Sequence, residues 1–407
     1  MSLAHQRLLI VGGSYAASEI ASHARENGYS EEIVIVSEES ELPYHRPPLS
    51  KAYLKGSSEE DIPLKAASLY SANDIDLELG VKVVGLEPGA NKAVLSNGTH
   101  IAFDVLALAV GARARRLTCA GANLGNVYYL RSISDARLLR DAAADAENVV
   151  VIGAGFIGLE IASVLVQQKK QVTVIEAENR PLARVVAPKM SQFFSTAHAE
   201  RGVKLSTSRT VQSLVGERGV VRQVALDDGT LIDADIVIVG IGSVPNVELS
   251  RQLGLVGKNG IVVDSRSRTS QENVFAAGDC ASYCGPYNSN GIRLESVQNA
   301  IDQSRVAGAV IAGADKVYDS FPWFWSDQYD LKLQIAGLPF GATESVLRSG
   351  TKSDISVFHF RGETCICVES VNRPREHIAA RRLLPQGDVT KRHLQEVDFD
   401  ISALIKR

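Results

Sequence analysis

Two segments of the chain decide its fold: LLIVGGSYAASEIASHARENGYSEEIVIVS (Leu8 to Ser37) and VVVIGAGFIGLEIASVLVQQKKQVTVIE (Val149 to Glu176). Each opens with an apolar run, reaches a glycine turn, continues with apolar residues at helical spacing and closes on a second apolar run. This order predicts a strand, a turn, a helix and a second strand, and the unit occurs twice. The apolar runs are nearly uninterrupted, as is typical of parallel strands buried on both faces.

The second segment carries the glycine pattern of a dinucleotide site. Its turn reads Gly153, Gly155 and Gly158 in a complete G-x-G-x-x-G between strand and helix, and Glu176 ends the next strand. The first glycine permits the tight turn, the second lets a pyrophosphate approach the helix N-terminus, and the third lets helix and strand pack closely. A carboxylate at Glu176 would bind a ribose 2′-hydroxyl and repel a 2′-phosphate, so we expect NADH rather than NADPH.

The first segment carries a degenerate copy of the same pattern. Gly12 keeps the first glycine, whereas Ser14 and Ala17 stand at the second and third glycine positions. Glu38 lies just past the second strand, where an acidic residue would meet an adenosine ribose. We expect a second dinucleotide site here.

Composition and charge limit the function classes. The chain has 407 residues, is 45% hydrophobic and carries a net charge of -4, which gives no sign of nucleic-acid binding. No apolar run reaches the roughly 18 residues that a membrane helix needs, and no signal peptide is evident. With five cysteines and no export signal, we expect a cytoplasmic protein without stable disulfides.

The remaining apolar runs complete the expected fold. Val105 to Val110, Ile236 to Ile241 and Val274 to Ala277 are short runs that fit the two parallel sheets. After about Asp315 the composition changes, and the runs 355–360 and 364–371 flank Arg361-Gly362 as in an antiparallel hairpin. We therefore predict an α/β fold with two Rossmann-like dinucleotide-binding domains and a C-terminal α+β domain.

Five further motifs occur in the order seen in one family. They are PYHRPPLSK (43–51), AVG (109–111), Thr269 followed by VFAAGD (274–279), ESVQNA (295–300) and PWFWSDQ (322–328). Together with the two glycine turns, they resemble those of the FAD-dependent ferredoxin reductases of bacterial oxygenase systems. The resemblance runs from about Leu8 to Arg382, and it implies a glutathione-reductase-like flavoprotein.

The resemblance implies three domains and two cofactors. An FAD-binding domain would cover residues 1–114 and 242–316, an NADH-binding domain 115–241, and the C-terminal domain 317–407. Electrons would pass from NADH through FAD to a [2Fe–2S] ferredoxin that supplies a haem-thiolate monooxygenase or a Rieske oxygenase.

The resemblance also implies a role for each motif residue. The ADP half of FAD would contact Gly12, Ser14, Ala17 and Glu38. The rest of FAD would contact Arg46, Lys51, Arg131, Asp279, Glu295, Ser296, Val297 and Trp325. NADH would contact Gly153, Gly155, Gly158 and Glu176, with Glu160 and Gly242 near the nicotinamide.

Two departures from the family pattern fall on the FAD site. Ser14 replaces a glycine, and Val110 stands where a threonine is usual. We expect both to weaken FAD binding rather than the fold.

The chemistry gives Lys51 and Glu160 an expected role. Hydride transfer needs the nicotinamide C4 within about 3–3.5 Å of flavin N5. A lysine near N5 would stabilise the developing negative charge, and a Lys51–Glu160 ion pair would join the two nucleotide-binding domains across the stacked rings. Trp325 would cover the flavin, although the aromatic cluster around it could also be plain core.

The cysteines argue against an internal dithiol. Residues 42–54 contain no cysteine, and Cys280 and Cys284, which follow Asp279, would not face N5. We interpret all five cysteines as small buried hydrophobes, and neither Cys280–Cys284 nor Cys365–Cys367 offers enough ligands for zinc.

Other functions remain open on the same fold. They are a rubredoxin reductase, an NADH oxidase, or a non-catalytic flavin-binding redox sensor. For a ferredoxin partner, which is typically acidic, we expect a basic docking face formed by arginines of two segments. The candidates are Arg293, Arg373, Arg375, Arg381 and Arg382.

Overall fold

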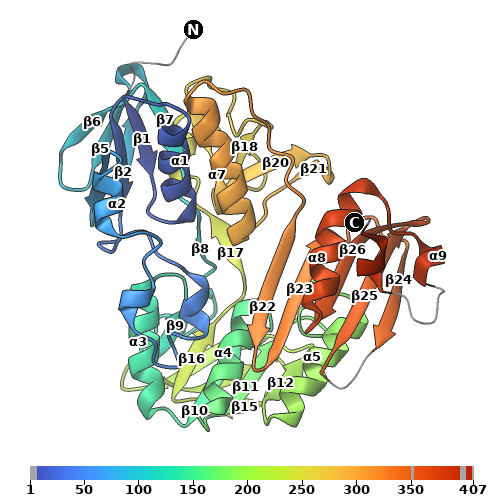
Figure 1. Ribbon diagram of the computed structural model, residues 1–407. Helices are drawn as coiled ribbons and strands as arrows, with labels where there is room; N and C mark the ends of the chain where they lie inside the picture. The colour runs from blue at the N-terminus through green and yellow to red at the C-terminus, as the bar shows by residue number, and fades with distance from the viewer. Residues whose placement is uncertain (1–6, 350–352, 395–399, 406–407) are drawn as a thin grey trace. The chain divides into compact units, whose positions relative to one another are not determined.

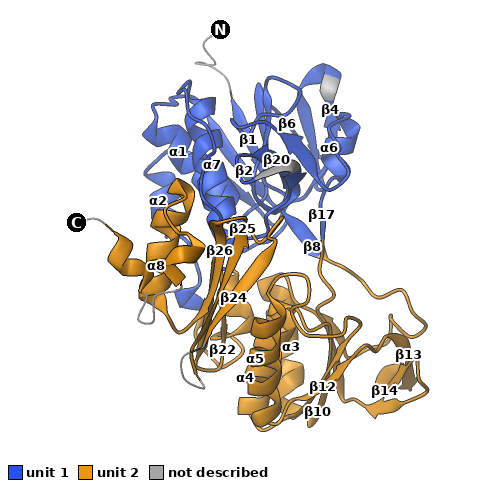
Figure 2. Cartoon of the chain, turned by 90° about the vertical axis from the view of Figure 1, so that its right-hand side faces the viewer, with its two compact units in different colours: residues 1–45, 59–113, 244–322 blue, residues 46–58, 114–243, 323–407 orange. Residues whose placement is uncertain are grey.

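The structure, a computed structural model, describes residues 7–349, 353–394 and 400–405. The chain forms two compact units, which Figure 2 colours separately. Unit 1 holds the residues up to 45 with 59–113 and 244–322, and unit 2 holds 46–58, 114–243 and the residues from 323 onward. The three-domain boundaries stay a prediction, and each unit is described by itself.

Five parallel strands form the main sheet of unit 1, in the order β19-β7-β1-β2-β3 (Figure 1). The strands are β1 (Leu8–Val11), β2 (Ile33–Ser37), β3 (Ile75–Leu79), β7 (Val105–Leu108) and β19 (Val274–Ala276). Helix α1 (Tyr15–Glu26) joins β1 to β2, so the first repeat forms the strand–turn–helix–strand unit that its sequence predicts.

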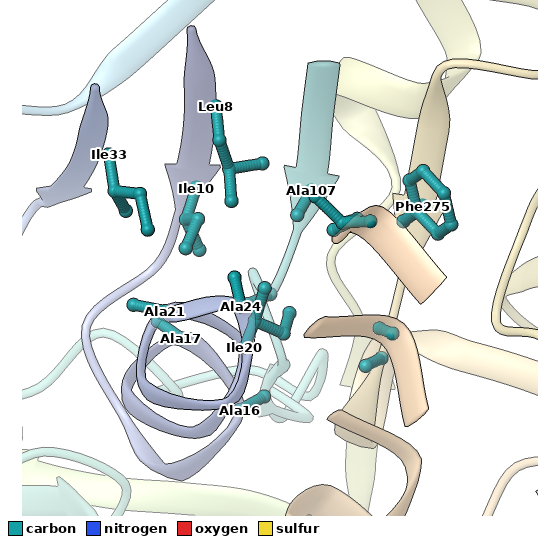
Figure 3. Close-up of a cluster of buried hydrophobic side chains, with 14 of the residues drawn as sticks. Leu8, Ile10, Ala16, Ala17, Ile20, Ala21, Ala24, Ile33, Ala107 and Phe275 are labelled. Atoms are coloured by element: carbon teal, nitrogen blue, oxygen red, sulfur yellow. The ribbon is translucent and has the colours of Figure 1, made fainter. Parts of the chain in front are cut away.

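One core cluster of unit 1 lies between this sheet and two helices, α1 and α7 (Val297–Ile311). Figure 3 shows Leu8, Ile10 and Ile33 of the strands pointing toward Ile20 of α1, and all four side chains are fully buried. Burying an aliphatic side chain of this size contributes roughly 1.5–3 kcal/mol. The small residues Ala17, Ala21 and Ala24 of α1 let helix and sheet approach closely.

Two small sheets and several short helices also belong to unit 1. One sheet is antiparallel, with β4 (Val83–Glu87), β5 (Lys92–Leu95) and β6 (His100–Ala102). The other contains β18 (Ile261–Val263), β20 (Ala281–Gly285) and β21 (Asn288–Ile292). The helices include α2 (Ala67–Ser71), α6 (Glu248–Gln252) and the 3-10 helix η4 (Gly278–Cys280). Strands β8 (Ala112–Ala114) and β17 (Ser243–Pro245) contain the points where the chain passes between units.

A second five-stranded parallel sheet forms the centre of unit 2, in the order β12-β11-β10-β16-β9. The strands are β9 (Val127–Tyr129), β10 (Asn148–Ile152), β11 (Gln171–Glu176), β12 (Lys204–Thr207) and β16 (Ile236–Val239). Helix α4 (Phe156–Gln167) joins β10 to β11, which repeats the arrangement of unit 1. Unit 2 also contains α3 (Ile133–Asp145), α5 (Pro188–Glu200) and an antiparallel sheet of β13 (Val211–Glu217), β14 (Val220–Leu226) and β15 (Leu231–Asp233).

The C-terminal residues of unit 2 form an antiparallel sheet in the order β22-β23-β26-β25-β24. The strands are β22 (Trp323–Gln328), β23 (Leu331–Gly337), β24 (Glu344–Ser349), β25 (Ile355–Arg361) and β26 (Thr364–Val371). The predicted hairpin is confirmed, because β25 and β26 pair across Gly362, whose φ of 60° suits a glycine turn. Helices α8 (Pro374–Leu383) and α9 (Lys391–Leu394) follow the sheet.

The packing of α1 against α7 generates a test of the fold. A Cβ added at Gly308 of α7 would lie 2.5 Å from the carbonyl oxygen of Ile20 and 2.9 Å from the nitrogen of Ala24. Gly308→Ala gains helix propensity of about 1 kcal/mol but forces the helices apart, and overpacking costs roughly 1–3 kcal/mol. We expect a net loss of up to about 2 kcal/mol in urea unfolding. Gly89→Ala, where a Cβ meets open space, is the control and should leave the unfolding midpoint unchanged.

Candidate active site

The two glycine turns have the same geometry at their first glycine. Gly12 has φ of 127° and a Cβ there would lie 2.2 Å from the carbonyl oxygen of Ala109. Gly153 has φ of 103° and a Cβ there would lie 2.4 Å from the carbonyl oxygen of Gly240. In both units the chain therefore turns tightly against the end of a neighbouring strand, and only glycine fits the turn.

The remaining positions of the turn distinguish the two units. In unit 2, a Cβ at Gly158 would meet the carbonyl oxygen of Gly153 at 2.1 Å, whereas a Cβ at Gly155, the N-cap of α4, would come no nearer than 4.0 Å to the carbonyl oxygen of Gly240. In unit 1, Ser14 is the N-cap of α1 and Ala17 is fully buried in the core. Both helices exceed eight residues and present backbone N–H groups at an open N-terminus, which is how proteins bind a pyrophosphate. The residues present therefore fit a dinucleotide in each unit.

The acidic residue at the strand end also differs between the units. Both carboxylate oxygens of Glu176 accept backbone hydrogen bonds, from the N–H of Ala154 (2.6 Å) and of Glu178 (2.9 Å). The matching strand register in unit 1 places Ser37 at this position, so Glu38 lies one residue further along. Glu38 is 66% exposed and pairs with Lys82 at 3.0 Å. Its role at an adenosine ribose stays a prediction.

Lys51 and Glu160 form the expected ion pair, but both lie in unit 2, whereas we expected the pair to join the two nucleotide-binding domains. The Lys51 Nζ donates to Glu160 Oε2 at 2.6 Å, with the lysine side chain 19% exposed and the glutamate 5%. The hydroxyl of Ser50 donates to the same oxygen at 2.5 Å, and that of Ser326 donates to Oε1 at 2.7 Å. Three donors from two segments, residues 50–51 and β22, therefore compensate the cost of burying the carboxylate.

The local sequence explains why these segments meet. Phe156 and Glu160 are four residues apart on α4 and share one face of the helix. Phe324 and Ser326 are two residues apart on β22 and share one face of the strand. The two faces pack together, with the rings of Phe156 and Phe324 4.5 Å apart. Lys51 follows directly after the 3-10 helix η1 (Pro47–Ser50), whose prolines suit such a turn.

Trp325 lies on the opposite face of β22. It is partly buried and stacks on Trp323, with ring centres 5.5 Å apart and planes at 30°. The guanidinium of Arg381 lies 4.2 Å from the centre of the Trp323 ring. Because Trp325 keeps exposed surface, it is available to a ligand; its role against a flavin stays a prediction.

The structure brings two other predicted residues of unit 2 together. Arg46 donates to the carbonyl oxygen of Arg131 at 2.7 Å. The N–H of Arg131 donates to Asp135, which also belongs to the capping box of α3. Gly242, with φ of 103°, lies near the guanidinium of Arg184, which a Cβ at Gly242 would approach to 3.6 Å.

The predicted residues of unit 1 beyond the glycine turn gather around η4 and the start of α7. Asp279 lies in η4, Glu295 precedes the N-cap, and the hydroxyl of Ser296 caps α7 by accepting from the N–H of Asn299 (3.0 Å). Val297 is the first residue of α7.

Arg293 was expected on a docking face, and that expectation is wrong. Its side chain is 8% exposed and pairs with Glu295. It also donates to the carbonyl oxygen of Asp279 (2.9 Å) and to Asn259 (3.1 Å). Arg293 therefore holds the segments around η4 together.

Several polar residues of the site carried no prediction. Ser50 and Ser326 lie inside motifs that the sequence singled out, and their positions next to Lys51 and Trp325 were a usable signal. Gln328 closes the same PWFWSDQ motif, whereas Arg184 and His198 had no such signal.

The cysteines provide no redox pair within the described chain. Each of the five is a free thiol. Burial raises the pKa of Cys280 to about 11 and that of Cys365 to about 12, which disfavours a reactive thiolate. In contrast to the prediction that all five are buried, Cys284 is exposed and Cys119 partly so.

Over residues 7–349, 353–394 and 400–405, no helix is both long and apolar enough to span a membrane. Within the same ranges, no cluster of three or more histidine, cysteine, aspartate or glutamate side chains could hold a metal ion.

Comparison with known proteins gives matches over nearly the whole chain. A model of the pyridine nucleotide-disulphide oxidoreductase family matches residues 6–304, and a reductase C-terminal model matches 323–405. Rhodocoxin reductase of Rhodococcus erythropolis is 44% identical over 98% of this chain and 94% of its own.

Two solved structures match with high similarity. The ferredoxin reductase for the CYP199A2 system from Rhodopseudomonas palustris has a TM-score of 0.95 at 37% identity, covering 98% of this chain and 100% of its own. The covalent complex of putidaredoxin reductase and putidaredoxin has a TM-score of 0.94 at 35% identity, covering 99% of this chain and 98% of that one.

The N-cap of α1 generates a prediction about FAD retention. Ser14 has φ of -143°, which any residue adopts, so the backbone does not require glycine here. Its side chain adds atoms at a position where the equivalent Gly155 has none. We expect Ser14→Gly to lower the Kd for FAD about threefold to tenfold, measured by quenching of flavin fluorescence on titration into apoprotein. An unchanged Kd would show that Ser14 does not weaken the site.

Proposed function

Because the chain belongs to the pyridine nucleotide-disulphide oxidoreductase family, we propose that it passes electrons from NADH, through FAD, to a [2Fe–2S] ferredoxin. The observation that carries the proposal is the Lys51–Glu160 pair. Glu160 is two residues past Gly158 on α4, so it holds Lys51 against the helix that opens at the glycine turn proposed for NADH. If a dinucleotide binds at that turn, the Lys51 cation belongs to the same unit as the dinucleotide.

The chain's own residues suit this chemistry. FAD, when bound, supplies an acceptor for a hydride and releases electrons singly. Gly12, Ser14, Ala17 and Glu38 would hold its ADP half, and Asp279 with the N-terminus of α7 would bind further along it. Lys51 would stabilise negative charge that develops during reduction, and Glu160 orients the lysine through its hydrogen bond.

The acceptor is proposed to be an external protein. The five cysteines are free thiols, and the segment around Lys51, residues 42–54, contains no cysteine. Two compared proteins are named for a ferredoxin system and for a complex with putidaredoxin, and each matches at least 98% of this chain. By this reading, the ferredoxin supplies a haem-thiolate monooxygenase or a Rieske oxygenase. The free thiols also support a location in the reducing cytoplasm.

Acceptor assays test the proposal against its rivals. We expect the purified protein to be yellow and to reduce a [2Fe–2S] ferredoxin with NADH faster than it reduces rubredoxin or oxygen. Preference for rubredoxin would indicate a rubredoxin reductase, and preference for oxygen an NADH oxidase. Bound flavin without NADH-dependent turnover would indicate a redox sensor.

Glu176 generates a prediction about the nicotinamide cofactor. Backbone hydrogen bonds fix its carboxylate at the end of β11, where it would meet the ribose. We expect a strong preference for NADH in kcat/KM, and Glu176→Ala should reduce the NADH-to-NADPH ratio at least tenfold. Glu178→Ala removes an exposed carboxylate two residues away and should leave the ratio unchanged. Equal kcat/KM values for NADH and NADPH in the unaltered protein would contradict this prediction.

Lys51 generates a prediction about the rate of flavin reduction. Lys51→Met removes the cation, so single-turnover reduction by NADH should slow at least tenfold while FAD is retained. Removing one partner of a buried pair also costs roughly 3–5 kcal/mol, so unfolding should be measured in parallel. The control is Lys55→Met, an exposed lysine of the same segment. An unchanged reduction rate in Lys51→Met would remove Lys51 from the mechanism.

Helix α8 generates a prediction about ferredoxin docking. Arg375, Arg381 and Arg382 are exposed on it, beside Ile378 at 61% exposure, whereas Arg373 pairs with Asp354 and Glu376. We expect ferredoxin reduction to fall steeply with ionic strength, while reduction of ferricyanide does not.

Charge reversal tests the same face. Arg375→Glu should slow only the ferredoxin step, by about threefold to tenfold at low salt. Arg218→Glu, at the exposed turn between β13 and β14, is the control. A ferredoxin rate that is independent of salt would place the docking face elsewhere.

A further inference from the structure

A line of hydrogen bonds leads from Glu160 into the interior of unit 2, away from Lys51. The Ser326 hydroxyl donates to Glu160 Oε1 (2.7 Å), and the Gln328 side-chain amide donates to the Ser326 hydroxyl (3.3 Å). His198 Nε2 lies 2.8 Å from Gln328 Oε1, and the Tyr329 hydroxyl lies 2.9 Å from His198 Nδ1. Ser326, Gln328 and His198 are fully buried.

The chemistry of the partners fixes the direction of this line. Gln328 Oε1 can only accept, so His198 carries its proton on Nε2, and Nδ1 accepts from Tyr329. Each donor then points toward Glu160. The reverse direction would turn the Ser326 proton away from a buried carboxylate oxygen and leave that oxygen without its donor, which is costly.

The members of the line stay neutral at physiological pH. Burial lowers the pKa of His198 to about 4, and burial raises the pKa of the Tyr329 hydroxyl. The charged group facing the outer end is Arg201, whose guanidinium lies 4.7 Å from the Tyr329 ring centre and bonds Asp330 at 2.9 Å. The inner end meets the charged pair of Glu160 and Lys51. The line therefore connects one cation–anion pair with another through neutral donors.

Such a line does more than fill space. Apolar residues of the same volume would pack between α4, α5 and β22 without the cost of burying three polar side chains. Hydrogen bonds in series polarise each other, so donors behind Ser326 strengthen its bond to Glu160. Tyr329 itself has φ of 58°, an uncommon conformation for an aromatic residue, which the turn between β22 and β23 maintains.

We propose that Tyr329, His198 and Gln328 are positioning residues for flavin reduction by NADH: through Ser326 they hold the Glu160 carboxylate in the orientation that pairs with Lys51. The inference rests on the proposed function, since it assigns the line to that reaction. None of the three residues is proposed to touch NADH or FAD.

The first test determines which ring nitrogen of His198 carries the proton, and it needs no cofactor. In apoprotein labelled with 15N-histidine, we expect His198 to remain a neutral Nε2–H imidazole from pH 8 to pH 5, in long-range 1H–15N spectra. The His198→Gln variant assigns its signal among the eight histidines. An Nδ1–H tautomer, or titration near pH 6.5, would overturn the direction and with it the proposal.

The second test measures how breaking the line changes the rate of flavin reduction. His198→Phe breaks the line and should slow single-turnover flavin reduction by NADH about tenfold. His198→Gln can still donate to Gln328 and accept from Tyr329, so it should restore the rate to within about twofold. The control is His377→Phe. His377 is also buried, and burial lowers its pKa to about 4, but neither of its ring nitrogens has a hydrogen-bond partner among the described residues.

The outcomes separate the two proposals. If His198→Phe does not fold, Gln328→Met cuts the same line with a side chain of similar size and should slow reduction equally. A rate unchanged in the folded variant, or no recovery in His198→Gln, would overturn the positioning role. If the unaltered protein shows no reduction by NADH at all, the proposed function fails, while the tautomer measurement still decides the direction of the line.

Discussion

The burial of one negative charge organises the second unit of this protein. Glu160 lies inside the unit with 4% of its surface exposed, and an unpaired carboxylate there would be prohibitively costly. Its donors come from Ser50 and Lys51 after the proline-rich turn and from Ser326 on β22. These segments are distant in sequence, so the carboxylate can be satisfied only when all of them are in place. The same requirement holds the Lys51 cation against α4, the helix that begins at the second glycine turn.

The two copies of the internal repeat share a backbone and differ in the contacts of their helices. The strand, glycine turn and helix agree closely in both copies, because the tight turn tolerates only glycine at Gly12 and Gly153. The helices differ in what their equivalent glutamates meet. Glu160 pairs with Lys51 inside unit 2, whereas Glu19 of unit 1 pairs with Arg305 at 2.9 Å on α7. The repeat thus keeps the glycine turn and the glutamate, and what differs between the copies is the cation with which the glutamate pairs.

Much of this could be predicted from the sequence, and the limits have physical reasons. The glycine spacing, the apolar runs and the hairpin at 355–371 are local signals, so the fold and the two turns followed from them. The Lys51–Glu160 pair was expected from motif residues. The line through Ser326, Gln328 and His198 was not, because Ser326 and Gln328 share one face of β22 but His198 reaches them from α5, which is distant in sequence. Arg293 was misplaced because a charge in a sequence does not reveal whether it faces solvent or a buried carbonyl.

The most direct test of the central claim is a double-mutant cycle on Lys51 and Glu160. Single-turnover flavin reduction by NADH would be measured in Lys51→Met, Glu160→Gln and the double variant, with FAD content checked in each. If the two side chains act as one pair, the double variant should be no slower than the slower single variant, because the second substitution removes an interaction that is already lost. If the two effects multiply instead, Lys51 and Glu160 act independently, and the pair is not the feature on which reduction by NADH depends.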